Sequence, residues 1–184
     1  GWGTAAAIDS LFLILLAAAA AREIIAGRKW NNLKIVGIVA LLAGVNLAFH
    51  LEAHVAGSTE YAARGGVALV IMLIALIGGR IIPSFTRNWL ARQTPGPMPS
   101  PFGRFDAATM AMTVLVLALW VARPLATLTG VLLLAVGVMH IFRLMRWAGY
   151  RTFADRLVLI LHIAYAFIPA GFILSALSAL GFIA

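Results

Sequence analysis

The chain has 184 residues, of which 63% are apolar and 11% carry a charge, and its mean hydropathy is +1.02. A soluble domain is about 45–50% apolar and about 25% charged, so this composition excludes an ordinary soluble fold. The net charge of +8 comes from basic residues between apolar runs, which indicates topology signals and lipid headgroups rather than nucleic acid. The absence of cysteine excludes disulfides, thiolate metal sites and cysteine nucleophiles.

The apolar runs are long and continuous, without the alternation that a barrel strand needs. Because a bilayer leaves only helices and closed barrels able to satisfy the backbone, we predict helices. The expected fold is all-α, an antiparallel bundle of about six transmembrane helices that forms a single transmembrane domain over residues 1–184. In chain order, the spans are expected at residues 4–21, 33–54, 65–82, 107–121, 125–141 and 157–182.

Lysine and arginine alternate between the connections of these spans. Three connections share twelve of the basic residues, and the other two hold only Arg64 and Arg123. By the positive-inside rule, the three basic loops are predicted to face the cytoplasmic side of the lipid bilayer. The twelve residues are Arg22, Arg28, Lys29, Lys34, Arg80, Arg87, Arg92, Arg104, Arg143, Arg146, Arg151 and Arg156.

The longest connection carries four prolines within seven residues, from Pro95 to Pro101. Such a stretch cannot be helical, and Pro83 is expected to end the third helix. We therefore predict a Pro-rich cytoplasmic linker over residues 83–106. It would join a first three-helix half, residues 1–82, to a second, residues 107–184.

All four histidines fall inside predicted spans, where ionisable side chains are expensive and often functional. His50 and His54 lie at i and i+4 on one helix face, with Asn46 one turn earlier. Two imidazoles at this spacing can ligate one metal ion, or one of them can bind a haem iron. The alternative is a pair of interfacial histidines that only make hydrogen bonds. Asp9 and Glu52 lie near the outer ends of the first and second predicted spans. Either could serve a proton path, but both are expected to be interfacial and solvated.

His140 and His162 lie on the fifth and sixth spans, at similar depths below the cytoplasmic boundary. They could be axial ligands of one haem, belong to two sites, or act as hydrogen-bonding groups between helices. Arg143, one turn from His140, could pair with a haem propionate. Alternatively, it acts only as a basic residue that sets the membrane topology.

The run GGRIIPSFTRN, residues 78–88, ends the third predicted span. Its arginines Arg80 and Arg87 are candidate anion donors at the membrane surface, beside a polar cluster of Ser84, Thr86 and Asn88. A helix end with arginines that face lipid headgroups is the alternative.

This run resembles the signature of the NnrS family of haem- and copper-containing membrane proteins. Three more stretches are similar to that family in the same order: NLAFHLEAH at 46–54, HIFRLMRWAG at 140–149 and LHIAYAFIPAG at 161–171. Histidine-containing segments that members carry, resembling WHxHEMxxG and GHTGR, do not occur here. The chain is therefore expected to be the middle half of a member or a shortened relative.

The resemblance implies a b-type haem, copper, and a role in tolerance of nitric oxide and nitrosative stress. It favours His50, His140 and His162 as metal ligands, with His54 as a further candidate, and Arg143, Arg80 and Arg87 as cofactor partners. It implies no particular reaction. Nitric oxide is the expected ligand and a membrane electron donor an expected partner. The alternatives are a cofactor-free transporter or channel, and a bis-histidine cytochrome that only transfers electrons.

Overall fold

A computed structural model describes residues 2–183, and these residues are almost entirely α-helical, with no strand among them. The predicted all-α class is confirmed. The 3₁₀ turns η1 (Trp30–Asn32) and η2 (Gly149–Arg151) lie between helices. The helices are α1 (Trp2–Ala26), α2 (Leu33–Ala56), α3 (Glu60–Leu90), α4 (Arg104–Ala122), α5 (Thr127–Met145) and α6 (Arg156–Ala179).

Five helices in the described part, α2 to α6, are long and apolar enough to cross a membrane. Their outward faces carry large apolar side chains such as Val55, Leu157 and Phe167, which are more than 70% exposed. Such faces are stable against lipid and not against water. The protein is therefore a multi-pass membrane protein. The first predicted span lies within α1, and its crossing of the bilayer stays a prediction.

The third helix differs from its prediction at Pro83. The helix continues through this proline to Leu90, so the prediction that Pro83 ends it is wrong. Proline removes one N–H donor, and membrane helices tolerate it when neighbouring groups satisfy the freed carbonyl. The same holds at Pro169 in α6. As a result Arg80 and Arg87 lie on a helix, and the irregular segment is residues 91–103, within the predicted linker.

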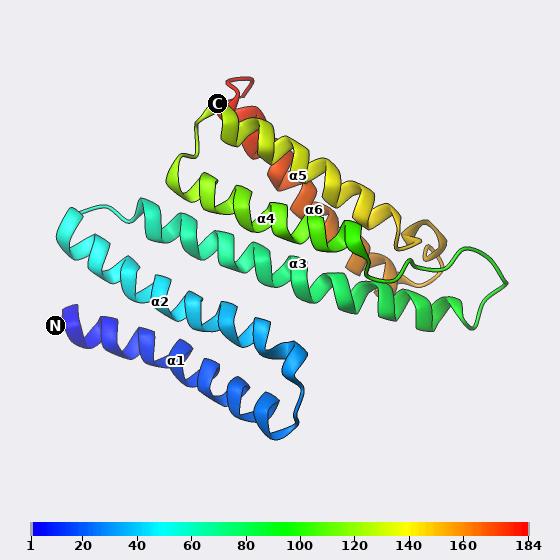
Figure 1. Ribbon diagram of the computed structural model, residues 1–184, viewed down its shortest axis with the longest axis horizontal. Helices are drawn as coiled ribbons and strands as arrows, with labels where there is room; N and C mark the ends of the chain where they lie inside the picture. Colours follow the sequence, from blue (N-terminus) through cyan, green and yellow to red (C-terminus); the bar gives the residue numbers. More distant parts are fainter. Residues whose placement is uncertain (1, 184) are drawn as a thin grey trace. The chain divides into compact units, whose positions relative to one another are not determined.

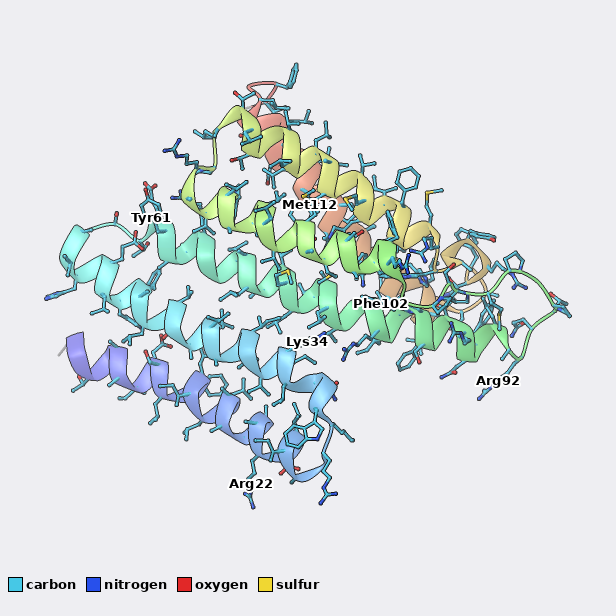
Figure 2. All side chains as sticks on the ribbon, viewed as in Figure 1. Arg22, Lys34, Tyr61, Arg92, Phe102 and Met112 are labelled. Carbon is cyan, nitrogen blue, oxygen red and sulfur yellow. The ribbon has the colours of Figure 1, made fainter. Side chains whose placement is uncertain are left out.

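The structure consists of two compact units whose boundary follows Leu73, inside α3. In the N-terminal unit, α1 packs beside α2 (Figure 1). Figure 2 shows Arg22 and Lys34 at one end of this unit and Tyr61 at the other. In the C-terminal unit, α5 packs along α6 and against α4. The predicted division into two three-helix halves stays a prediction.

The core of the C-terminal unit mixes apolar and polar side chains. Val116 of α4, Val136 of α5 and Ala176 of α6 are fully buried, as expected for closely packed helices. Polar groups are buried beside them, which is costly unless each finds a hydrogen-bond partner. These are Thr86, Asp106, Thr109, Thr113, Thr129, His140, Arg143, Thr152 and His162.

Candidate functional site

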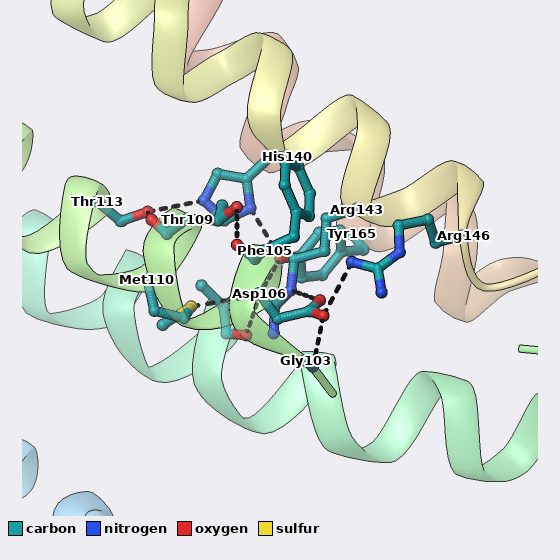
Figure 3. Close-up of polar contacts among 11 residues, drawn as sticks. Gly103, Phe105, Asp106, Thr109, Met110, Thr113, His140, Arg143, Arg146 and Tyr165 are labelled. Atoms are coloured by element: carbon teal, nitrogen blue, oxygen red, sulfur yellow. Dashed lines mark hydrogen bonds and ion pairs between the residues drawn. The ribbon is translucent and has the colours of Figure 1, made fainter. Parts of the chain in front are cut away.

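A buried polar network lies between α4, α5 and α6 of the C-terminal unit (Figure 3). On α4, Asp106, Thr109 and Thr113 share one face, since residues three, four and seven apart align on a helix. The network's other side chains come from α5 and α6. Ion pairs and hydrogen bonds among apolar helices are the arrangement that intramembrane ionisable groups require.

Arg143 on α5 is the cationic centre of this network and is only 1% exposed. Its Nε donates to Asp106 Oδ1 at 3.1 Å. Its Nη1 donates to the hydroxyl of Tyr165 at 2.9 Å and to the backbone carbonyl of Ala75 at 3.1 Å. The guanidinium thus connects α3, α4, α5 and α6 through partners that all belong to the protein.

Asp106 is the carboxylate that balances this charge. Its second oxygen, Oδ2, accepts hydrogen bonds from the backbone N–H of Gly103 and from Arg146 Nη1, both at 3.0 Å. Asp106 therefore caps the first turn of α4. It also pairs with Arg143, on α5, and with Arg146, the residue that follows the end of α5. An acidic side chain in the first turn also interacts favourably with the helix dipole.

Both ring nitrogens of His140 have protein partners. Nδ1 lies 2.9 Å from the Tyr165 hydroxyl, and Nε2 lies 2.9 Å from Thr113 Oγ1. The Thr113 hydroxyl donates to the carbonyl of Thr109 at 2.7 Å, so it accepts the Nε2–H of His140. Nδ1 then accepts from the Tyr165 hydroxyl. The ring stacks on Phe172, with 5.5 Å between centroids.

These bonds form a chain with one direction. Arg143 donates to Tyr165, Tyr165 to His140, His140 to Thr113, and Thr113 to the carbonyl of Thr109. Within the described residues, no buried side-chain nitrogen or oxygen lacks a partner. A fully satisfied network of this kind rigidifies the helices that it joins.

His162 on α6 lies outside this chain. Its Nδ1–H donates to the Val158 carbonyl at 3.0 Å, and Nε2 faces Thr86 Oγ1 at 3.3 Å. The Thr86 hydroxyl donates its hydrogen to the Ile82 carbonyl at 2.8 Å. The contact between this hydroxyl and His162 Nε2 is therefore weak. A Cβ at Gly149 would overlap the His162 ring, so the η2 turn packs directly on it.

A second polar group lies in the N-terminal unit, where Asp9 of α1 meets α2. Its Oδ2 is 2.9 Å from His50 Nε2 and accepts from Asn46 Nδ2 at 2.8 Å. Asn46 Oδ1 accepts from Ser10 Oγ at 3.0 Å. His54 is exposed in the last turn of α2. The predicted stripe of Asn46 and His50 therefore faces Asp9.

Glu52 has a structural role in the N-terminal unit. Its carboxylate oxygens accept the backbone N–H groups of Tyr61 and Ala62 at 3.1 and 2.8 Å. These are orphan donors of the first turn of α3, where a carboxylate is favourable.

Arg80 and Arg87, predicted as cofactor partners, are exposed on α3 and line a cavity of about 240 Å³. None of the four histidines lines this cavity. Among residues 2–183 there is also no cluster of three or more His, Cys, Asp or Glu side chains that could hold a metal ion.

Sequence reasoning did not identify Asp106, Tyr165, Thr109 or Thr113 as site residues. Asp106 carried a usable signal, because no other acidic residue occurs between Glu60 and Asp155. A lone carboxylate at the start of a span, among basic loops, requires a cationic partner. The two threonines at i and i+4 then continue its helix face.

A family model described as NnrS protein matches residues 1–184, the full sequence. The chain belongs to the NnrS family. No curated protein and no solved structure matches it. Three of the four stretches that resemble this family surround the polar core of the C-terminal unit: the α3 stretch supplies Thr86, the α5 stretch His140 and Arg143, and the α6 stretch His162 and Tyr165. The NnrS resemblance thus includes several of the residues that hold these helices together, but none from α4.

Proposed function

We propose that this protein binds a b-type haem in a bacterial inner membrane and takes part in the response to nitric oxide and nitrosative stress. Copper is the proposed second metal, and a membrane electron donor the proposed partner. Membership of the NnrS family supports this role. When bound, the haem iron would supply a site for nitric oxide. The observation that carries the proposal is the pairing of His50 with Asp9.

His50 has the hydrogen bonding of a metal-ligating histidine. Such residues usually donate one ring N–H to a carboxylate or carbonyl, which orients the ring and raises the basicity of the other nitrogen. Here Nε2 pairs with Asp9, so Nδ1 would be the nitrogen left for a metal. The side chain is 21% exposed, so a cofactor can reach it. His50 therefore fits the group, and His54, one turn away, is the natural comparison.

The inner histidines fit less well. Ligation by His140 would break a hydrogen bond on either ring nitrogen, and Arg143, 1% exposed, has no free face for a propionate. His162 donates Nδ1–H to a carbonyl as ligands do, but Thr86 would have to move away from Nε2. We therefore rank His50 first, His162 second and His140 third. A single haem held by His140 and His162 together is the least favoured arrangement.

The test is the absorption spectrum of the purified protein, oxidised and reduced, together with the haem content per folded protein. Wild type should show a Soret band, His50→Ala should lose most of it, and His54→Ala should keep it. Asp9→Asn should weaken haem binding by about 10-fold or more, since it removes the carboxylate partner. Full haem in His50→Ala would exclude the outer site, and His162→Ala and His140→Ala would then test the inner one.

A second candidate is a cofactor-free transporter that moves protons. Buried His140, hydrogen-bonded on both ring nitrogens, favours it, because histidines inside membrane helices occur in proton pathways. This candidate predicts no Soret band, and a proton flux into liposomes that His140→Gln abolishes. A Soret band without proton flux would reject it.

A further inference from the structure

The end of α3 and the irregular segment after it enclose a cavity of about 240 Å³. Arg80, Ser84 and Arg87 line one wall, and they share a helix face because they lie four and three residues apart. Ser100 and Phe102 line the other wall. Two arginines and two serines therefore line one small space, and their guanidinium and hydroxyl groups are hydrogen-bond donors.

The charge around this cavity is positive. Asp106 is the carboxylate among the lining residues, and its two oxygens already pair with Arg143 and Arg146. Arg87 Nη2 donates to the carbonyl of Pro99 at 3.0 Å, which is a neutral partner. A guanidinium has five N–H groups, so this bond fixes the side chain and leaves further donors for a ligand.

We propose that this cavity binds a phosphate-like oxyanion. Arginine forks and serine hydroxyls are the donors that such anions prefer, and the planar fork can bind two oxygens at once. The volume lies below the roughly 300–1,000 Å³ of pockets that take drug-sized ligands, so it suits a small ion or headgroup rather than a porphyrin.

Two sources can supply this anion. The helix α3 has 31 residues and is about 46 Å long, longer than a hydrocarbon core of about 30 Å, so its arginine-bearing end reaches the membrane surface. Phe102 lines the cavity and is 61% exposed, and Phe85, next to Ser84 in the sequence, is 56% exposed, so apolar side chains there are available to contact lipid. The anion is therefore either a free oxyanion from water or the phosphate of an anionic lipid. The proposal does not rest on bound haem.

The first experiment measures the midpoint of thermal unfolding of the full chain in phosphatidylcholine nanodiscs. Inorganic phosphate is compared with chloride at equal ionic strength. Phosphate should raise the midpoint of wild type by several degrees, as a ligand does well above its dissociation constant. Arg87→Gln and Ser84→Ala should lose most of this rise, and Arg80→Lys part of it, because lysine lacks the planar fork.

Arg92→Gln is the matched control, because Arg92 is exposed just beyond α3 and does not line the cavity (Figure 2). It removes the same charge and should keep the full response. The Ser84→Ala variant guards against misfolding of the arginine variants, since it changes no charge.

The second experiment replaces phosphatidylcholine with phosphatidylglycerol and counts bound lipids by native mass spectrometry. Stabilisation by this lipid without a phosphate response assigns the site to a headgroup; a phosphate response without lipid retention assigns it to a free oxyanion. Both should depend on Arg87 and not on Arg92. The proposal is overturned if neither probe stabilises wild type, or if Arg92→Gln loses the response as fully as Arg87→Gln.

Discussion

Asp106 accepts hydrogen bonds from two arginines and from the N-terminus of α4. Replacing it by alanine leaves Arg143 buried without its ion partner, and breaking a buried pair in this way costs about 3–5 kcal/mol. We expect Asp106→Ala to lower the free energy of unfolding by that amount in a denaturation titration in detergent. Asp155→Ala, which removes only the N-cap of α6, should cost about 1 kcal/mol.

Tyr165 connects Arg143 to His140 through one hydroxyl. Tyr165→Phe keeps the ring, which packs on Trp147, and removes only the oxygen. His140 Nδ1 then loses its donor, so we expect a loss of about 1–3 kcal/mol in stability. Tyr150→Phe, at a side chain 61% exposed, should cost nothing measurable. Equal stability of the two variants would mean that the chain of hydrogen bonds contributes nothing to the fold.

At the scale of elements, the side chain of Arg143 on α5 reaches α3 at Gly79. A Cβ there would overlap the guanidinium of Arg143, which passes directly over the glycine. Gly79→Ala should therefore destabilise the protein by about 1–3 kcal/mol, although alanine is the better helix former. Gly171→Ala in α6 has nothing within 4 Å of its Cβ and should be neutral or slightly stabilising. Unfolding midpoints of the two variants, compared with wild type, give the test.

The element that sequence reasoning misjudged was α3. Proline removes one N–H donor, but membrane helices tolerate it, and α3 continues from Pro83 to Leu90. The remaining helices agree closely with the predicted spans. For example, the predicted span at 107–121 lies within α4, Arg104–Ala122. Hydrophobic length is a local property, so the sequence alone reveals it.

For the whole molecule, the basic loops predict the orientation. In intact cells, a cysteine at Gln93 should be protected from membrane-impermeant thiol reagents, whereas one at Ser58 should react. The reason is that twelve of the fourteen basic residues fall in the connection of Gln93 and the two connections predicted to share its side. The chain contains no cysteine, so each variant has a single reporter. Labelling after cell lysis is the control, and the reverse pattern would place the polar core of the C-terminal unit on the outer side.

Composition and the lengths of the apolar runs were sufficient to predict an all-α membrane fold, because a membrane-spanning helix depends on residues that are close together in the chain. The four quoted stretches were sufficient for the NnrS family. The sequence also located His140 as an ionisable group inside a span, but it assigned Arg143 to a basic loop, and the burial of Arg143 appears only in the structure. Only the tertiary structure decided their partners: Tyr165 with His140, Asp106 with Arg143, and Asp9 with His50. These pairs join different helices. The spacing of residues along one helix does not determine how that helix is rotated, or at what depth it lies, relative to its neighbour.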